Sequence, residues 1–136
     1  MTIHIGITGT RNGCTITQIR RLFGTLWGFK GYDHEGVFFH FGDCVGVDEQ
    51  GFHLAKALGF RTISHPPKAW AYRAYCDAYA IEPTKPYMIR NRDIVKAVAV
   101  LIVVPAGPEA DNPRSGTWAT YRMAVKAGVE TVVIEP

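Results

Sequence analysis

Short runs of β-branched and aromatic residues alternate along this chain with longer segments of helical period, and this alternation constrains the fold more than any other feature. It is typical of βαβ units stacked around a parallel sheet. The most apolar run, Val98–Val104, predicts a central strand with both faces buried. We therefore expect an α/β fold with a doubly wound parallel sheet, formed by residues 1–136 as a single domain.

The predicted sheet has five strands, for which we expect a Rossmann-like order of 3-2-1-4-5. The strands are predicted at Ile3–Thr8, Val37–Phe41, Phe60–Ser64, Val98–Val104 and Thr131–Ile134. Four helices are predicted. The first begins at the capping box of Thr15 and Gln18, and the second follows GDCVGVD and ends at Gly59. The third begins near Tyr87, and the last begins at the sequence SGT, residues 115–117. Tyr72, Tyr75, Cys76 and Tyr79 also recur at helical spacing after Pro66 and Pro67.

Apolar positions at helical spacing predict which side of each helix is buried. The expected inward residues are Ile16, Ile19, Leu22, Phe23 and Leu26 in the first helix, Val47, Leu54, Ala55 and Leu58 in the second, and Trp118, Tyr121, Ala124 and Val125 in the last.

The composition excludes several classes of protein. An apolar content of 47% argues against a disordered chain, and no apolar run approaches the ~20 residues of a membrane span. The N-terminus lacks the features of a signal peptide, and three widely spaced cysteines, Cys14, Cys44 and Cys76, favour a reducing compartment. We expect a cytoplasmic protein with no membrane partner.

The five histidines form no HxxxH or HxH pattern, so no metal site is predicted, and no cofactor is expected. His40 lies in an apolar run and is interpreted as a core residue with satisfied hydrogen bonds. The net charge of +3 favours anionic ligands only weakly. Because the basic residues are scattered, a nucleic-acid partner is less favoured than a small molecule.

Three glycine-containing segments, TGTRNG, GDCVGVD and RSGT, each follow a predicted strand. In a doubly wound parallel sheet such segments meet at the carboxyl edge, where ligands bind. Glycine and a helix N-terminus expose backbone amides to an anion, so these segments predict a phosphate site. The same residue types also suit helix caps and tight turns in any α/β protein. The candidate residues are Gly9, Thr10, Arg11, Gly42, Gly46, Ser115, Gly116 and Thr117.

Asp43 and Asp48 repel phosphate, so we expect them to accept hydrogen bonds from a sugar, a base or the backbone of a helix start. Arg90, Asn91 and Arg92 form a dense polar patch before the central strand, and Arg90 and Asn91 are candidate ligand contacts. Trp70 and Trp118 offer rings that stack on a base, although both also suit the core or an interface.

The chain resembles the SLOG superfamily, the Rossmann-like group that includes the DNA-processing protein DprA and the LOG phosphoribohydrolases. The resemblance rests on IGITGTR, HFGDCVGVDEQGFHLAKALGF, HPPKAW, RNRDIVKAVAVLIVVP and SGTWATYRMAVKAG, which together cover most of the chain. It is strongest to the small stand-alone YspA-like members of bacteria and phages. The resemblance implies a pocket for a nucleotide or nucleotide-derived ligand, and a homodimer or other homo-oligomer.

LOG enzymes cleave the N-glycosidic bond of nucleoside monophosphates with an arginine and with a glutamate in a PGGxGTxxE segment. Arg90 or Arg92 corresponds to that arginine, but PEADNPR is inserted before SGTWAT, and Thr120 stands at the glutamate position. Threonine cannot replace a carboxylate in this chemistry.

Three functions remain open at this point. The first is binding of a nucleotide or nucleotide-derived ligand, and the second is cleavage or transfer at a nucleotide N-glycosidic bond, with Asp43, Asp48 and Arg90 as candidate catalytic residues. The third is DprA-like binding of single-stranded DNA, which requires a basic groove with stacking aromatics.

Overall fold

The computed structural model describes residues 2–31 and 36–136 and contains a parallel sheet with the strand order β4-β3-β2-β1-β5-β6. The strands are β1 (Ile3–Gly9), β2 (Val37–Phe41), β3 (Arg61–Ser64), β4 (Ala80–Ile81), β5 (Val100–Val104) and β6 (Glu130–Val133). The helices are α1 (Ile16–Gly28), α2 (Val47–Ala57), α3 (Tyr87–Ala97) and α4 (Gly116–Lys126), with short 3₁₀ helices η1 (Phe29–Gly31) and η3 (Glu109–Asp111).

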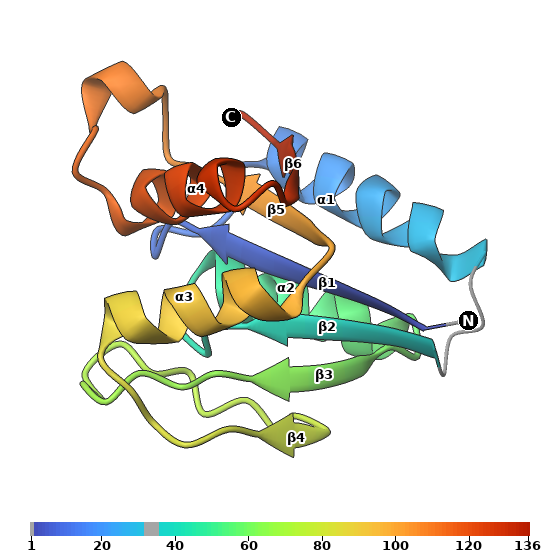
Figure 1. Cartoon of the computed structure of the whole chain (residues 1–136). Coiled ribbons are helices and arrows are strands. Elements are labelled where there is room, and N and C mark those ends of the chain that lie inside the picture. Colours follow the sequence, from blue (N-terminus) through green and yellow to red (C-terminus); the bar gives the residue numbers. More distant parts are fainter. Residues whose placement is uncertain (1, 32–35) are drawn as a thin grey trace.

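The helices cover both faces of the sheet, as a doubly wound fold requires (Figure 1). One layer of core packs α1 and α2 against the sheet, with Leu22, Val47 and Phe39 among its members. The second layer packs α3 and α4 against the other face through residues such as Ile94 and Leu101. All five residues of β5 are buried, which confirms the expectation that both faces of this strand are covered. The strand is not central, because it lies between β1 and the edge strand β6.

The α/β Rossmann-like class is confirmed, but the predicted count of five strands and the order 3-2-1-4-5 are wrong. The five predicted strands correspond to β1, β2, β3, β5 and β6, with boundaries that agree within two residues. A sixth strand, β4, pairs in parallel with β3 at the edge of the sheet. A strand of two residues is too short to show a recognisable period in the sequence. Ile81 is 55% exposed, so the strand also lacks the buried apolar run that would have predicted it.

The helical spacing of Tyr72, Tyr75, Cys76 and Tyr79 does not correspond to a helix, because this segment is irregular. Tyr75 has a φ of +56°, which a helix does not allow. Side chains distant in sequence accept hydrogen bonds from the backbone amides of this segment. The Cys76 amide donates to Asp43 Oδ1 at 2.9 Å, and the Tyr79 amide donates to Thr62 Oγ1 at 3.1 Å. Tertiary hydrogen bonds therefore override the local spacing of the tyrosines.

The helix faces agree with the prediction only in part. The capping box of Thr15 and Gln18 at the start of α1 is confirmed. Leu22 and Leu26 are fully buried, but Ile16 is 72% exposed and Phe23 is 43% exposed, so the buried stripe is narrower than predicted. In α4, Val125 is 54% exposed, whereas Trp118 and Ala124 are buried.

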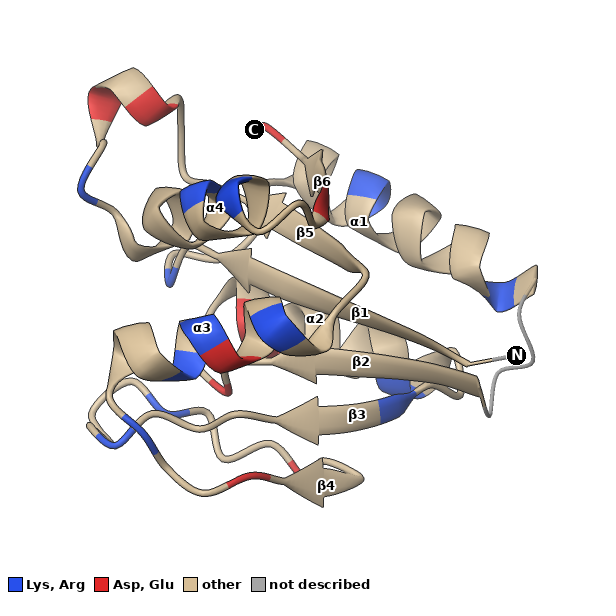
Figure 2. Ribbon diagram, in the orientation of Figure 1, with Lys and Arg blue, Asp and Glu red and all other residues tan. Residues whose placement is uncertain are grey.

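Lys and Arg residues are spread over α1, α3, α4 and the loops around β3 and β4 (Figure 2). Within residues 2–31 and 36–136, no helix has the length and apolar character needed to cross a bilayer.

Candidate functional site

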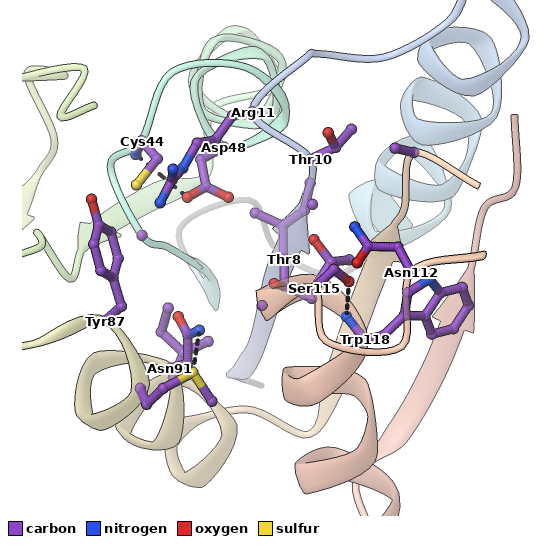
Figure 3. Close-up of a pocket in the computed structure, with 18 of the residues that line it drawn as sticks. Thr8, Thr10, Arg11, Cys44, Asp48, Tyr87, Asn91, Asn112, Ser115 and Trp118 are labelled. Carbon is purple, nitrogen blue, oxygen red and sulfur yellow. Dashed lines mark hydrogen bonds between the residues drawn. The ribbon is translucent and has the colours of Figure 1, made fainter. Parts of the chain in front are cut away.

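A cavity of about 630 Å³ opens at the carboxyl edge of the sheet, beside the first turns of α3 and α4 (Figure 3). The chain leaves β1 toward one face and β5 toward the other, which is the place where such folds open a crevice (Figure 1). Ten of the predicted ligand-binding residues line this cavity: Gly9, Thr10, Arg11, Gly42, Asp48, Arg90, Asn91, Ser115, Gly116 and Thr117. Asp43 and Gly46 are not among its lining residues.

Two of the predicted glycines bring the first and second loops into contact. A Cβ on Gly9 would lie 2.5 Å from Val47 Cβ and 2.9 Å from the Val104 carbonyl oxygen. Gly46 has a φ of +92°, and a Cβ there would lie 2.5 Å from the Arg11 carbonyl oxygen. Both glycines are therefore required for the close approach of the backbone, whether or not a ligand is bound.

The start of α4 presents backbone amides at the cavity. The Ser115 hydroxyl caps the helix by accepting the Trp118 amide at 3.1 Å. No hydrogen bond in the described part of the chain uses the amides of Gly116 and Thr117, and the first turn of α4 contains no acidic residue. A Cβ added to Gly116 would meet no atom within 4 Å. This helix start thus offers free donors and a partial positive charge to an anion.

Arg90 projects from α3 and is only 5% exposed. Its guanidinium donates to the carbonyls of Gly42 and His65 and, through Nε, to Asn91 Oδ1 at 2.7 Å. Its remaining contacts are with Cys44 Sγ at 3.8–3.9 Å. The ion pairs among the described residues do not include Arg90, so its charge is buried beside the cavity without a carboxylate within 4 Å.

Asp48 is the buried carboxyl of the cavity, with 8% of the residue exposed. The Cys44 amide donates to its Oδ2 at 3.4 Å. Burial raises the pKa of Asp48 from 3.8 to about 6, although the Arg90 charge opposes this rise. Asp48 can therefore gain and lose a proton close to neutral pH, as a catalytic acid or base must.

Asp43, the other candidate carboxylate, holds a neighbouring segment in place. Its Oδ2 forms an ion pair with Arg73 Nε at 3.0 Å, and its Oδ1 accepts the Cys76 amide at 2.9 Å. The residue is 1% exposed and has a φ of +55°, which aspartate adopts more readily than most residues. These contacts give Asp43 a role in fixing residues 73–76 rather than a position in the cavity wall.

Sequence reasoning did not identify several lining residues, among them Thr8, Cys44, Tyr87, Met88, Gly107, Asp111 and Asn112. Thr8 and Cys44 lie within the glycine segments TGTRNG and GDCVGVD, and this position is the signal that could have indicated them. Asp111 and Asn112 belong to the insertion before α4, whose path has no sequence pattern. Of the two tryptophans considered for stacking, Trp118 lines the cavity and is 6% exposed, whereas Trp70 is 76% exposed and lies outside the lining.

The interpretation of His40 as a satisfied core residue is confirmed. Its ring is hydrogen-bonded to His4 on one side and to His65 on the other, each at 2.8 Å, and the residue is 4% exposed. Burial is the main reason why its pKa is lowered from 6.5 to about 3. No group of three or more His, Cys, Asp or Glu side chains within the described ranges is placed to hold a metal ion.

Neither a model of a known protein family nor a curated protein sequence matches this chain. Among solved structures, it is similar to the molybdenum cofactor binding protein from the phototrophic bacterium Rippkaea orientalis, with a TM-score of 0.73 and 22% identity over all of this chain and 78% of the other. The Moco carrier protein from Chlamydomonas reinhardtii gives a TM-score of 0.69 and 22% identity, with the same coverage.

DNA processing protein A (DprA) from Streptococcus pneumoniae is also similar, with a TM-score of 0.71 and 17% identity over 97% of this chain and 50% of that one. At these identities the comparisons establish the fold alone, a Rossmann-like α/β fold.

Proposed function

We propose that this chain binds a nucleotide or nucleotide-derived molecule whose phosphate lies between the Gly9–Arg11 loop and the start of α4. The observation that carries the proposal is that Gly9 and Gly116, far apart in sequence, line the same cavity. The free amides at the start of α4 suit a phosphate, and the hydroxyls of Thr10 and Thr117 add further polar groups.

The rest of the cavity suits the sugar or base of such a ligand. Its volume of about 630 Å³ lies within the range of small-molecule sites. Asn91 is 9% exposed, and among the described residues its amide nitrogen has only the Met88 sulfur, at 4.0 Å, as a partner. An amide with unused donors, next to the carboxyl of Asp48, supplies the complementary groups that a base edge or a ribose hydroxyl requires.

The structural comparisons support a small-molecule ligand in this fold. Two of the similar proteins are described as binding or carrying the molybdenum cofactor, and this chain spans 78% of each. DprA is a DNA-processing protein, but this chain corresponds to half of it.

Calorimetric titration with adenosine, guanosine, cytidine and uridine 5′-monophosphates tests the proposal. We expect one of them to bind, and Gly116→Val to weaken that binding at least about 10-fold because the new side chain occupies the phosphate position. Gly24→Val is the matched control, since a Cβ at this exposed glycine of α1 also meets no atom within 4 Å. If no nucleotide binds, or if Gly116→Val binds as well as Gly24→Val, the proposal is wrong.

Cleavage of a nucleotide N-glycosidic bond is the second candidate function, and Asp48 is the observation that favours it. A buried carboxyl with a pKa of about 6 is suited to donate a proton to a leaving base. Thr120, at the position of the LOG glutamate, donates its hydroxyl to the Gly116 carbonyl at 2.8 Å and is 1% exposed. Release of free base from nucleoside monophosphates, abolished in Asp48→Asn, is the expected result, whereas release by both proteins would exclude Asp48 from the chemistry.

A further inference from the structure

Two arginines contact the same aromatic ring at one end of the cavity. The guanidinium carbon of Arg11 lies 5.2 Å from the centre of the Tyr87 ring, and that of Arg90 lies 5.3 Å from it. Arg11 also lies 4.2 Å from the centre of the Tyr72 ring. Cation–π contacts of this kind hold a guanidinium in place without using its hydrogen-bond donors.

Neither arginine is neutralised by a carboxylate. The ion pairs among residues 2–31 and 36–136 join Arg73 to Asp43, Lys85 to Asp93 and Arg122 to Glu109. Asp48 is close enough for its charge to interact with that of Arg90, but the ion pairs among the described residues do not include it. Arg90 is only 5% exposed. Burying such a cation without a neutralising carboxylate is costly, and an anionic group of a ligand removes that cost. Arg11 is exposed and adds a second positive charge beside it.

This arginine end is separate from the start of α4. Figure 3 shows Arg11, Cys44, Asp48 and Tyr87 on one side of the cavity and Asn112, Ser115 and Trp118 on the other, with Thr8 between them. The α4 side offers backbone amides, and the Arg11 side offers guanidinium groups. The cavity therefore contains two different environments for an anion.

We propose that the ligand carries two separated anionic groups, as a nucleoside 3′,5′-bisphosphate does, with one at the start of α4 and the other at Arg11 and Arg90. This inference rests on the proposed nucleotide-binding function and names the class of nucleotide. Guanidinium groups recognise phosphate oxygens through paired hydrogen bonds, and within residues 2–31 and 36–136 Nη2 of Arg90 has only the Cys44 sulfur as a partner.

The test compares adenosine 3′,5′-bisphosphate with adenosine 5′-monophosphate by calorimetry, with the guanosine pair in parallel. We expect the bisphosphate to bind at least about 10-fold more tightly, because the second phosphate gains charge-assisted hydrogen bonds. Arg11→Gln should remove most of this preference, and because Arg11 is exposed, the variant is expected to fold. Arg122→Gln is the control, since Arg122 is exposed on α4 and outside the cavity lining.

The outcomes separate this inference from the proposed function. Equal affinity for bisphosphate and monophosphate overturns the two-anion inference and leaves nucleotide binding in place. A preference for bisphosphate that is unchanged in both Arg11→Gln and Arg90→Lys also overturns it, because the second phosphate would then lie elsewhere. If neither compound binds and the monophosphate panel fails as well, both proposals are wrong.

Discussion

Two buried groups are expected to make the stability of this chain respond to pH in opposite directions. The pKa of His40 is lowered from 6.5 to about 3, first by burial and then by the neighbouring charges of His65 and His4. The pKa of Asp48 is raised from 3.8 to about 6, chiefly by burial. Both residues are less than one-tenth exposed, so solvent screens these effects little.

The sign of each contribution follows from which state binds protons more strongly. Folded His40 binds them more weakly than unfolded His40, so its contribution is complete above pH 6.5 and is lost as the pH falls toward 3. Folded Asp48 binds them more strongly, so its contribution is complete below pH 3.8 and is lost as the pH rises through about 6. When the pH falls from 8 to 5, the titration of His40 therefore lowers the free energy of unfolding by ~2 kcal/mol, and that of Asp48 raises it by ~1 kcal/mol.

Two variants separate these opposing contributions. Relative to wild type, His40→Gln should gain ~2 kcal/mol of unfolding free energy between pH 8 and pH 5, and Asp48→Asn should lose ~1 kcal/mol. Urea unfolding followed by tryptophan fluorescence at the two pH values measures both differences, and titrating groups that do not interact with the substituted residue cancel in the comparison. His53→Gln, at an exposed histidine of α2, is the control. Curves for His40→Gln and wild type that stay parallel from pH 8 to pH 5 would refute the reasoning.

Three further predictions concern backbone and loop positions. Gly46→Ala forces a Cβ into a left-handed turn and should lower the unfolding free energy by ~2 kcal/mol or more, whereas Gly24→Ala in exposed α1 should raise it by roughly 0.5–1 kcal/mol; equal effects in urea unfolding would contradict this. Thr15→Ala removes the capping hydroxyl of α1 and should cost ~1 kcal/mol in the same assay, and an unchanged midpoint would show that the cap is not needed. Arg73→Met leaves buried Asp43 without its cation, so limited proteolysis should cut residues 66–79 faster than in wild type. Equal rates would show that the ion pair between Arg73 and Asp43 does not hold this segment in place.

The alternation of strands and helices predicted the layered fold because it depends on local periods. β1, β2, β3, β5 and β6 each carry enough apolar or β-branched residues to be recognised. β4 and the segment after β3 depend instead on contacts with residues distant in sequence. Asp43 and Thr62 bond the backbone at Cys76 and Tyr79, and no local pattern encodes such bonds.

The position of the candidate site could be predicted because glycine segments follow three of the parallel strands. Their meeting at one edge follows from topology alone. The roles of the carboxylates could not be predicted, since Asp43 and Asp48 lie five positions apart and have similar sequence surroundings. Only the structure separates them: Asp43 contacts Arg73 and Cys76, whereas Asp48 lines the cavity. The contact of Arg11 and Arg90 with one tyrosine likewise joins three segments that no sequence pattern relates.

The attachment of residues 66–79 to Asp43 has a consequence for how this protein can diverge. Insertions or deletions at 66–71 would move Tyr72 and, through it, the guanidinium of Arg11 at the mouth of the cavity. Among the described residues, neither the six strands nor the two apolar layers include any of residues 66–71. A change of length at residues 66–71 would therefore reshape the cavity beside Arg11 without repacking either apolar layer.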